Sequence, residues 1–140
     1  AQLRIVEGNP GHRRVPEKNK GVIPGDLVCP TNVMQDERAR VYWDSYLANT
    51  VPGHLAPADG PLLARLCIAL SMADQATEIV QKTGVLIRSD AGPKQNPAVS
   101  IIVRSTETAR KLASELCLTV AERSRVGAAP AKKDNPFANL

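Results

Sequence analysis

Residues 31–50 carry the hydrophobic pattern of one helix face. One set of side chains recurs at the i, i+4, i+7, i+8 and i+11 positions, namely Ala39, Trp43, Tyr46, Leu47 and Thr50. This spacing predicts an amphipathic helix. Thr31 or Asn32 is expected to cap its start, and the sequence Val51-Pro52-Gly53 to end it.

A second, broader apolar stripe predicts a central helix. We expect Asp59 to cap the N–H groups behind Pro61 and Gly84 to end the helix in a left-handed conformation. The stripe consists of Leu62, Leu66, Ala69, Leu70, Ala73 and Val80.

The next two elements are a short hairpin and a third helix. Residues 85–87 are apolar and residues 89–93 have turn composition, so residues 85–95 favour a small hairpin. Asn96-Pro97 then predicts a capped helix start. The third helix has one face made of Val99, Ile102, Val103, Thr106, Ala109, Ala113 and Leu116.

The fourth predicted helix begins at a capping box, Thr119 to Glu122, and ends near Gly127. The fold expected is all-α, with three to four helices in an oligomerising core over residues 31–127 and the hairpin between the second and third helices. Residues 1–30 contain four prolines and predict an extended basic arm. Residues 128–140 predict a flexible tail.

Composition narrows the possible functions. With 140 residues and only 3% aromatics, one small domain of aliphatic side chains is expected. The formal charge of +4 favours a polyanionic partner. Three widely spaced cysteines favour reduced thiols in a cytosol, and no apolar run is long enough to span a membrane. A soluble intracellular protein is expected.

Catalysis has little support in the sequence. His12 and His54 are the only histidines, so no metal site is predicted, and no cofactor or nucleotide-binding motif is present. Asp36 and Glu37 lie beside arginines, as in solvent-facing ion pairs. Cys67 can approach His54, but its place on an apolar stripe favours a core position. No catalytic residue is predicted.

Binding has two candidate regions, one at each end. An extended basic arm can follow DNA phosphates, although a solvated tail without function has equal support from charge alone. The candidate DNA-binding residues are Arg4, His12, Arg13, Arg14, Lys18 and Lys20 in the arm, and Arg123 and Arg125 near the last helix. Phe137 and Leu140 form a candidate apolar anchor for a partner protein.

Several motifs in order resemble the small-terminase family of tailed phages. Gly8-Asn9-Pro10-Gly11 precedes basic residues, Trp43 and Leu47 lie on the first helix, and Gly53-His54-Leu55 opens the second. Asn96-Pro97 and Glu115-Leu116-Cys117 complete the resemblance, with Cys117 where the family usually has Gly. The resemblance implies a helical, non-catalytic homo-oligomer, usually a ring. It also implies that the oligomer recognises viral double-stranded DNA in the host cytoplasm and recruits or regulates the large terminase, which holds the ATPase and nuclease.

The residues alone agree with an oligomer, because a small domain with broad apolar stripes gains burial by self-association. The expected oligomer interface is on the third helix, at Val99, Ile102, Val103, Leu112 and Leu116. Two alternatives remain at this point. One is a helical adaptor that binds only protein, and the other is a small hydrolase that uses Cys67 or Cys117.

Overall fold

A computed structural model describes residues 21–126. The described elements are α2 (Thr31–Met34), α3 (Glu37–Asn49), the 3-10 turn η1 (Pro57–Asp59), α4 (Gly60–Thr83), β1 (Leu86–Ser89), β2 (Gly92–Gln95), α5 (Pro97–Glu115) and α6 (Val120–Val126). The all-α expectation is confirmed, as is the small hairpin between the two longest helices.

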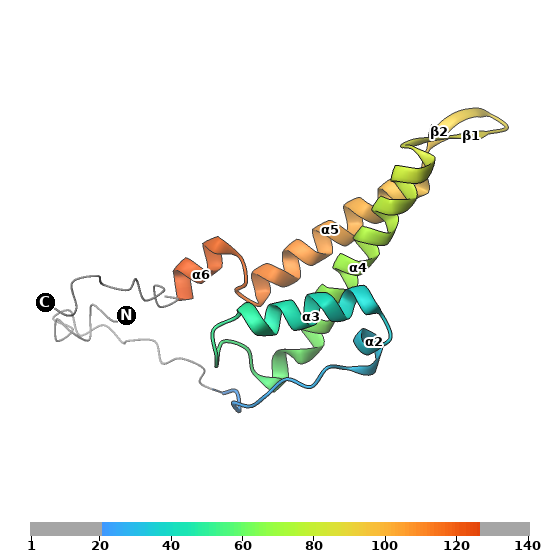
Figure 1. Cartoon of the computed structure of the whole chain (residues 1–140). Helices are drawn as coiled ribbons and strands as arrows, with labels where there is room; N and C mark the ends of the chain where they lie inside the picture. Colours follow the sequence, from blue (N-terminus) through green and yellow to red (C-terminus); the bar gives the residue numbers. More distant parts are fainter. Residues whose placement is uncertain (1–20, 127–140) are drawn as a thin grey trace, which may run out of the picture.

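The frame of the molecule is the antiparallel pair of α4 and α5 (Figure 1). Helix α3 packs along α4 as far as Glu78, five residues before α4 ends. The hairpin extends from one end of the pair, whereas the described chain begins and α6 lies toward the other end. The two regions are therefore separated by the length of the helical pair.

The core lies where α3, α4 and α5 meet. Trp43, Leu63, Leu66 and Cys67 are fully or almost fully buried there. Because the chain has one Trp and one Phe, the core is filled mainly by Leu and Ala side chains. Alanines at positions such as Ala69 and Ala109 allow the two long helices to pack closely.

The hairpin has a fixed base. Strands β1 and β2 pair antiparallel with Ile87 opposite Lys94 and Arg88 opposite Pro93. Gly92 has a φ of +105°, which glycine adopts without the steric penalty of a side chain. The buried Asn96 side chain donates to Thr83 Oγ1 at 2.7 Å and to the Gly84 carbonyl at 2.8 Å. These bonds fix the hairpin to the ends of both helices.

The prediction of one continuous helix over residues 31–50 is wrong, because the chain breaks at Gln35 and Asp36 between α2 and α3. Asp36 adopts an extended conformation, and its Oδ1 accepts hydrogen bonds from the N–H groups of Arg38 and Ala39, both at 3.1 Å. Asp36 therefore caps α3. No side chain caps α2, where Thr31 or Asn32 was the expected cap.

The predicted capping role of Asp59 is also wrong. Its side chain makes no capping bond to α4 and instead accepts a hydrogen bond from the Ala56 N–H at 2.8 Å. The 3-10 turn η1 precedes α4 directly, so the Asp59 carboxylate closes that turn rather than the helix start. Pro61 lies in the first turn of α4, as expected.

Both ends of α5 are defined by local contacts. At its start, the Asn96 side chain accepts from the Ala98 N–H at 3.0 Å, which confirms the predicted cap. At its end, the Cys117 N–H donates to Ser114 O and the Leu118 N–H to Ala113 O. This pair of bonds is a Schellman motif. Its left-handed position is held by Cys117, which has a φ of +54°.

Candidate nucleic-acid interface

Charge is unevenly divided between the described core and the two ends of the chain. Residues 21–126 contain eleven Lys or Arg and eleven Asp or Glu, so the core is formally neutral. The net charge of +4 therefore comes entirely from residues 1–20 and 127–140. The candidate residues Arg4, His12, Arg13, Arg14, Lys18, Lys20, Phe137 and Leu140 lie outside the described residues.

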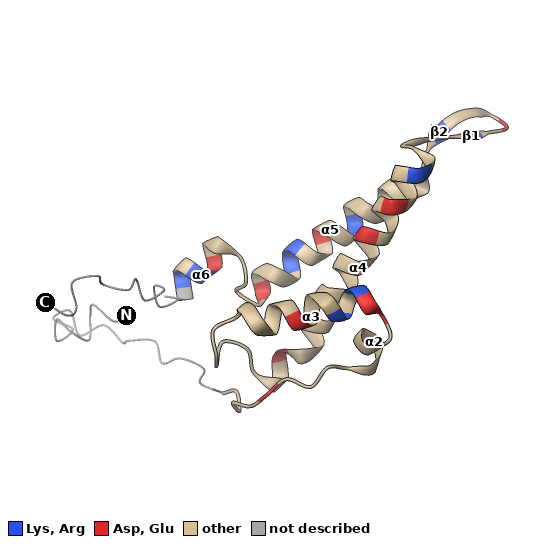
Figure 2. Cartoon of the chain, viewed as in Figure 1, with Lys and Arg blue, Asp and Glu red and all other residues tan. Residues whose placement is uncertain are grey.

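The neutral core is itself divided by sign. Residues 21–80 contain seven acidic and three basic residues, whereas residues 81–126 contain four acidic and eight basic ones. The excess of basic residues thus follows the hairpin, α5 and α6, and the excess of acidic residues follows the first part of the core (Figure 2). A polyanion is attracted to the former and repelled by the latter.

Helix α6 places the candidate residues Arg123 and Arg125 on an exposed surface. Arg125 is 3.3 Å from Glu122 Oε1, an ion pair within the same helix. Thr119 Oγ1 lies 3.4 Å from the Glu122 N–H, which is the backbone half of the predicted capping box. Arg123 has no ion pair with a described residue. Arg123 is therefore more available than Arg125 for contact with a phosphate.

The basic residues of α5 are partly neutralised by their own helix. Glu107 accepts a bidentate pair of hydrogen bonds from Arg110, at 2.8 and 3.0 Å, and Lys111 Nζ lies 3.9 Å from Glu107 Oε1. The hydrogen bond from Arg110 lowers the pKa of Glu107. These side chains are exposed to solvent, so their ion pairs contribute little to stability and mainly keep this face of α5 solvated.

Three further cations lie at the hairpin end and were not singled out in the sequence. Lys82 is in the last turn of α4, Arg88 is on β1 and Lys94 is on β2. All three are exposed, and none has an ion pair within the described part of the chain. The signal was weak in sequence because Lys82 and Lys94 are twelve positions apart, and the hairpin places both at the same end of the molecule.

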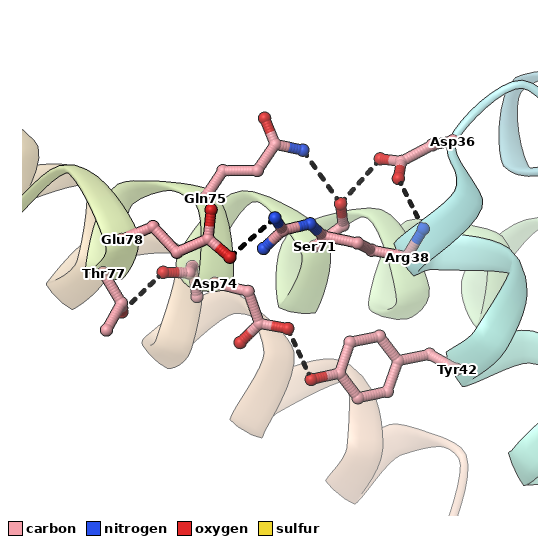
Figure 3. Close-up of polar contacts among 9 residues, drawn as sticks. Asp36, Arg38, Tyr42, Ser71, Asp74, Gln75, Thr77 and Glu78 are labelled. Atoms are coloured by element: carbon pink, nitrogen blue, oxygen red, sulfur yellow. Dashed lines mark hydrogen bonds and ion pairs between the residues drawn. The ribbon is translucent and has the colours of Figure 1, made fainter.

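A row of polar contacts joins α3 to α4 (Figure 3). Asp36 Oδ2 accepts from the Ser71 hydroxyl at 2.7 Å, and Ser71 accepts from Gln75 at 3.0 Å. Tyr42 donates to Asp74 at 2.7 Å, and Arg38 pairs with Glu78 at 2.6 Å. Asp36 therefore has a structural role between two elements, in place of the solvent-facing ion pair that was predicted.

These contacts shift two pKa values. Partial burial acts to raise the pKa of Asp36, but hydrogen bonds from Ser71, Ala39 and Arg38 outweigh it and hold the pKa below its ordinary value. The hydrogen bond to Asp74 raises the pKa of Tyr42. Both shifts favour the hydrogen-bonded form at neutral pH.

The hydrolase alternative has no support at Cys67. This thiol is 0% exposed in the core, as predicted, and burial raises its pKa to about 12. His54 does not approach it in a hydrogen bond, because its Nε2 lies 2.9 Å from the Leu116 carbonyl at the end of α5. Cys117 occupies the left-handed position at the end of α5, where its N–H donates to Ser114 O. No cluster of three metal-ligating side chains occurs among residues 21–126.

The five residues expected at an oligomer interface differ in exposure. Leu116 is 5% exposed and belongs to the chain's own core, and Leu112 packs against that core. Val99 and Ile102 are partly buried. Val103 is 62% exposed, so it is the member of this set that is best placed to reach a second molecule.

An apolar groove is present on another face. It has a volume of about 620 Å³ and lies between the segment before α2 and α4, with Thr108 of α5 at its side. Val28 and Met72 line it, and both are exposed. No described helix is long and apolar enough to cross a membrane.

Residues 39–133 match the family model of the phage terminase small subunit. The chain belongs to this family. The match covers α3 to α6 and thus the helical frame with its hairpin. No curated protein and no solved structure matches the chain. As a small terminase subunit, the protein has a role in phage DNA packaging, and the family is generally non-catalytic, with DNA and the large terminase as its partners.

Proposed function

We propose that this small terminase subunit binds viral double-stranded DNA as a multivalent homo-oligomer, and that it recruits or regulates the large terminase in the host cytoplasm. The observation that carries DNA binding is the charge distribution. The described core is neutral, and the first twenty residues hold five Lys or Arg against two Glu. An excess of cations outside a neutral helical core is suited to phosphate contacts that do not depend on base sequence.

Self-association is supported by the large apolar side chains that the core leaves exposed. Single exposed apolar residues are normal on a monomer, but many of them on one small domain, with Val28 and Met72 lining a groove, favour an interaction surface. The exposed large apolar residues on the helices are Met34, Val41, Leu47, Leu62, Met72, Ile79, Ile101, Val103 and Val120. An assembly that buries some of them would also multiply the arms and give avidity for DNA.

Regulation of the large terminase is assigned to the C-terminal segment. Phe137 is the only Phe of the chain and lies with Leu140 in a polar sequence, the composition of a short anchor for a partner. A subunit that uses this anchor without binding DNA is the alternative function. It predicts large-terminase binding with no DNA affinity at moderate salt.

The test of DNA binding removes two arm cations. In the variant Arg13→Ala plus Arg14→Ala, we expect the affinity for a random-sequence duplex to fall about tenfold, because two phosphate contacts are lost. The slope of log affinity against log salt concentration should fall by about two, since each phosphate contact contributes about 0.9. Fluorescence anisotropy at several salt concentrations measures both quantities.

The control is Arg40→Ala plus Arg110→Ala, which removes the same charge from core cations that have ion pairs. We expect this control to change the salt slope little, because neither cation lies in the arm. Equal slopes for the arm variant and the unaltered chain would contradict the arm as a DNA contact. Absence of any DNA binding would favour the protein-only alternative.

A further inference from the structure

The hairpin end of the molecule carries a second concentration of positive charge, distant from the arm. Between residues 82 and 95 there are three basic residues, Lys82, Arg88 and Lys94, and one acidic residue, Asp90. Figure 2 shows basic residues on both strands and on the last turn of α4, with the acidic residue at the turn. These three cations are called the tip cations below.

None of the tip cations forms an ion pair with a described residue. Five ion pairs join described residues, and all of them involve other cations, on α3, α5 and α6. Lys82 does lie at the C-terminus of α4, where a cation complements the helix dipole. Arg88 and Lys94 have no such role, because they lie on strands.

The pairing register places the two strand cations on opposite faces. Arg88 is opposite Pro93, and the neighbouring pair is Ile87 with Lys94. Side chains alternate along a strand, and directly opposed residues share a face. Arg88 and Lys94 therefore extend to opposite sides of the same ribbon. A flat partner can contact only one of these faces at a time.

A DNA groove presents phosphates on both of its walls. The major groove is about 12 Å wide and admits a two-stranded ribbon. A ribbon with a cation on each face can contact the two phosphate walls at once. This geometry favours a nucleic acid groove over an acidic protein surface as the partner of the hairpin.

The hairpin is also held firmly enough to position these charges. An isolated two-stranded hairpin is only marginally stable in water. Here, Asn96 joins the end of α4 to the start of α5 through Thr83 Oγ1 and the Gly84 carbonyl, and its own N–H donates to Val85 O at 2.8 Å. The base of the ribbon is therefore attached to both long helices.

We propose that the β1–β2 hairpin is a DNA contact, which inserts between the phosphate walls of a groove and binds them through Lys82, Arg88 and Lys94. This inference rests on the proposed DNA-binding function and adds a second site to it. The hairpin lies at the opposite end of the α4–α5 pair from the start of the described chain (Figure 1). A duplex bound there contacts a part of the subunit other than the arm.

The test replaces the tip cations together, as Lys82→Gln, Arg88→Gln and Lys94→Gln in the full chain. We expect the affinity for a random-sequence duplex to fall about tenfold and the salt slope to fall by about two to three, since each phosphate contact contributes about 0.9. The charge-conserving variant Lys82→Arg, Arg88→Lys and Lys94→Arg should keep both values, because phosphate contacts need only a cation.

The matched control removes three other core cations, as Arg40→Gln, Arg110→Gln and Lys111→Gln, all of which have ion pairs. An equal change of slope in this control and in the tip variant would overturn the proposal. So would unchanged DNA binding of the tip variant together with loss of self-association or of large-terminase binding, which would make the hairpin a protein contact.

If the unaltered chain binds no DNA, the proposed function fails as well. If only the arm variant loses binding, the tip proposal alone fails.

Discussion

At the scale of single residues, Cys117 ends α5 in a left-handed conformation, which is unfavourable for a residue with a side chain. Its N–H and that of Leu118 close the Schellman motif, which requires a left-handed residue at this point. A side chain in this conformation costs about 1–2 kcal/mol, and glycine avoids most of that cost. Glycine is also the residue that the resemblance leads us to expect at this position.

We expect Cys117→Gly to raise the free energy of unfolding by about 0.5–1 kcal/mol, because relief of backbone strain exceeds the entropy that glycine adds to the unfolded chain. Urea unfolding measures the change. Cys117→Ala is the control, since it removes the sulfur but keeps a Cβ in the left-handed conformation. Destabilisation of the glycine variant to the level of the alanine variant would show that the thiol contacts matter more than the strain.

Asp36 is the second residue with a testable role, because one carboxylate caps α3 and also accepts from the fully buried Ser71. We expect Asp36→Ala to lower the free energy of unfolding by about 1–3 kcal/mol, since a cap is lost and a buried hydroxyl loses its acceptor. The control is Asp44→Ala on the same helix, whose one ion pair with Arg40 spans 3.9 Å between exposed side chains.

The lowered pKa of Asp36 adds a pH dependence to the same variant. A carboxyl group with a depressed pKa in the folded state contributes stability above its unfolded value of about 3.9, and this stability is lost as pH falls through the folded pKa. As the pH falls from 5 through the folded pKa of Asp36, the unaltered chain should therefore lose more free energy of unfolding than the Asp36→Ala variant. Parallel losses in the two proteins would contradict this assignment.

At the scale of elements, local sequence signals explain what could be predicted. Asn96-Pro97 sets the start of α5 through a cap and a proline that need no distant partner. Gly84 and Gly92 both adopt positive φ, in agreement with the predicted helix end and turn. Where the information lies within a few residues, the sequence predicts the element.

The break between α2 and α3, which the sequence analysis missed, involves a contact between distant residues. Asp36 breaks the first predicted helix because its carboxylate also binds Ser71, 35 residues away in the chain. His54 contacts the Leu116 carbonyl across 62 residues, and no spacing rule anticipates such a pair. The tip cations are similar, since their proximity exists only after the hairpin forms.

At the scale of the whole molecule, the proposed function makes the DNA affinity depend on self-association, because one neutral core with basic ends offers few phosphate contacts. The predicted interface on α5 has one strongly exposed member, Val103, whereas Leu116 belongs to the monomer core. We expect Val103→Asp to dissociate the oligomer, because a buried charge without a partner is costly at an interface. Light scattering measures the mass. DNA affinity should fall by a factor of about 100 or more once the arms act singly.

A variant of matched exposure separates this interface from a general effect of surface charge. Val41 on α3 is 64% exposed, close to the 62% of Val103, and lies on a different helix. Val41→Asp should leave the mass unchanged if α5 forms the interface. The opposite result, with Val41→Asp dissociated and Val103→Asp intact, would place the interface on α3. DNA binding should follow the mass in either case, because avidity depends on the number of joined arms and not on which helix joins them.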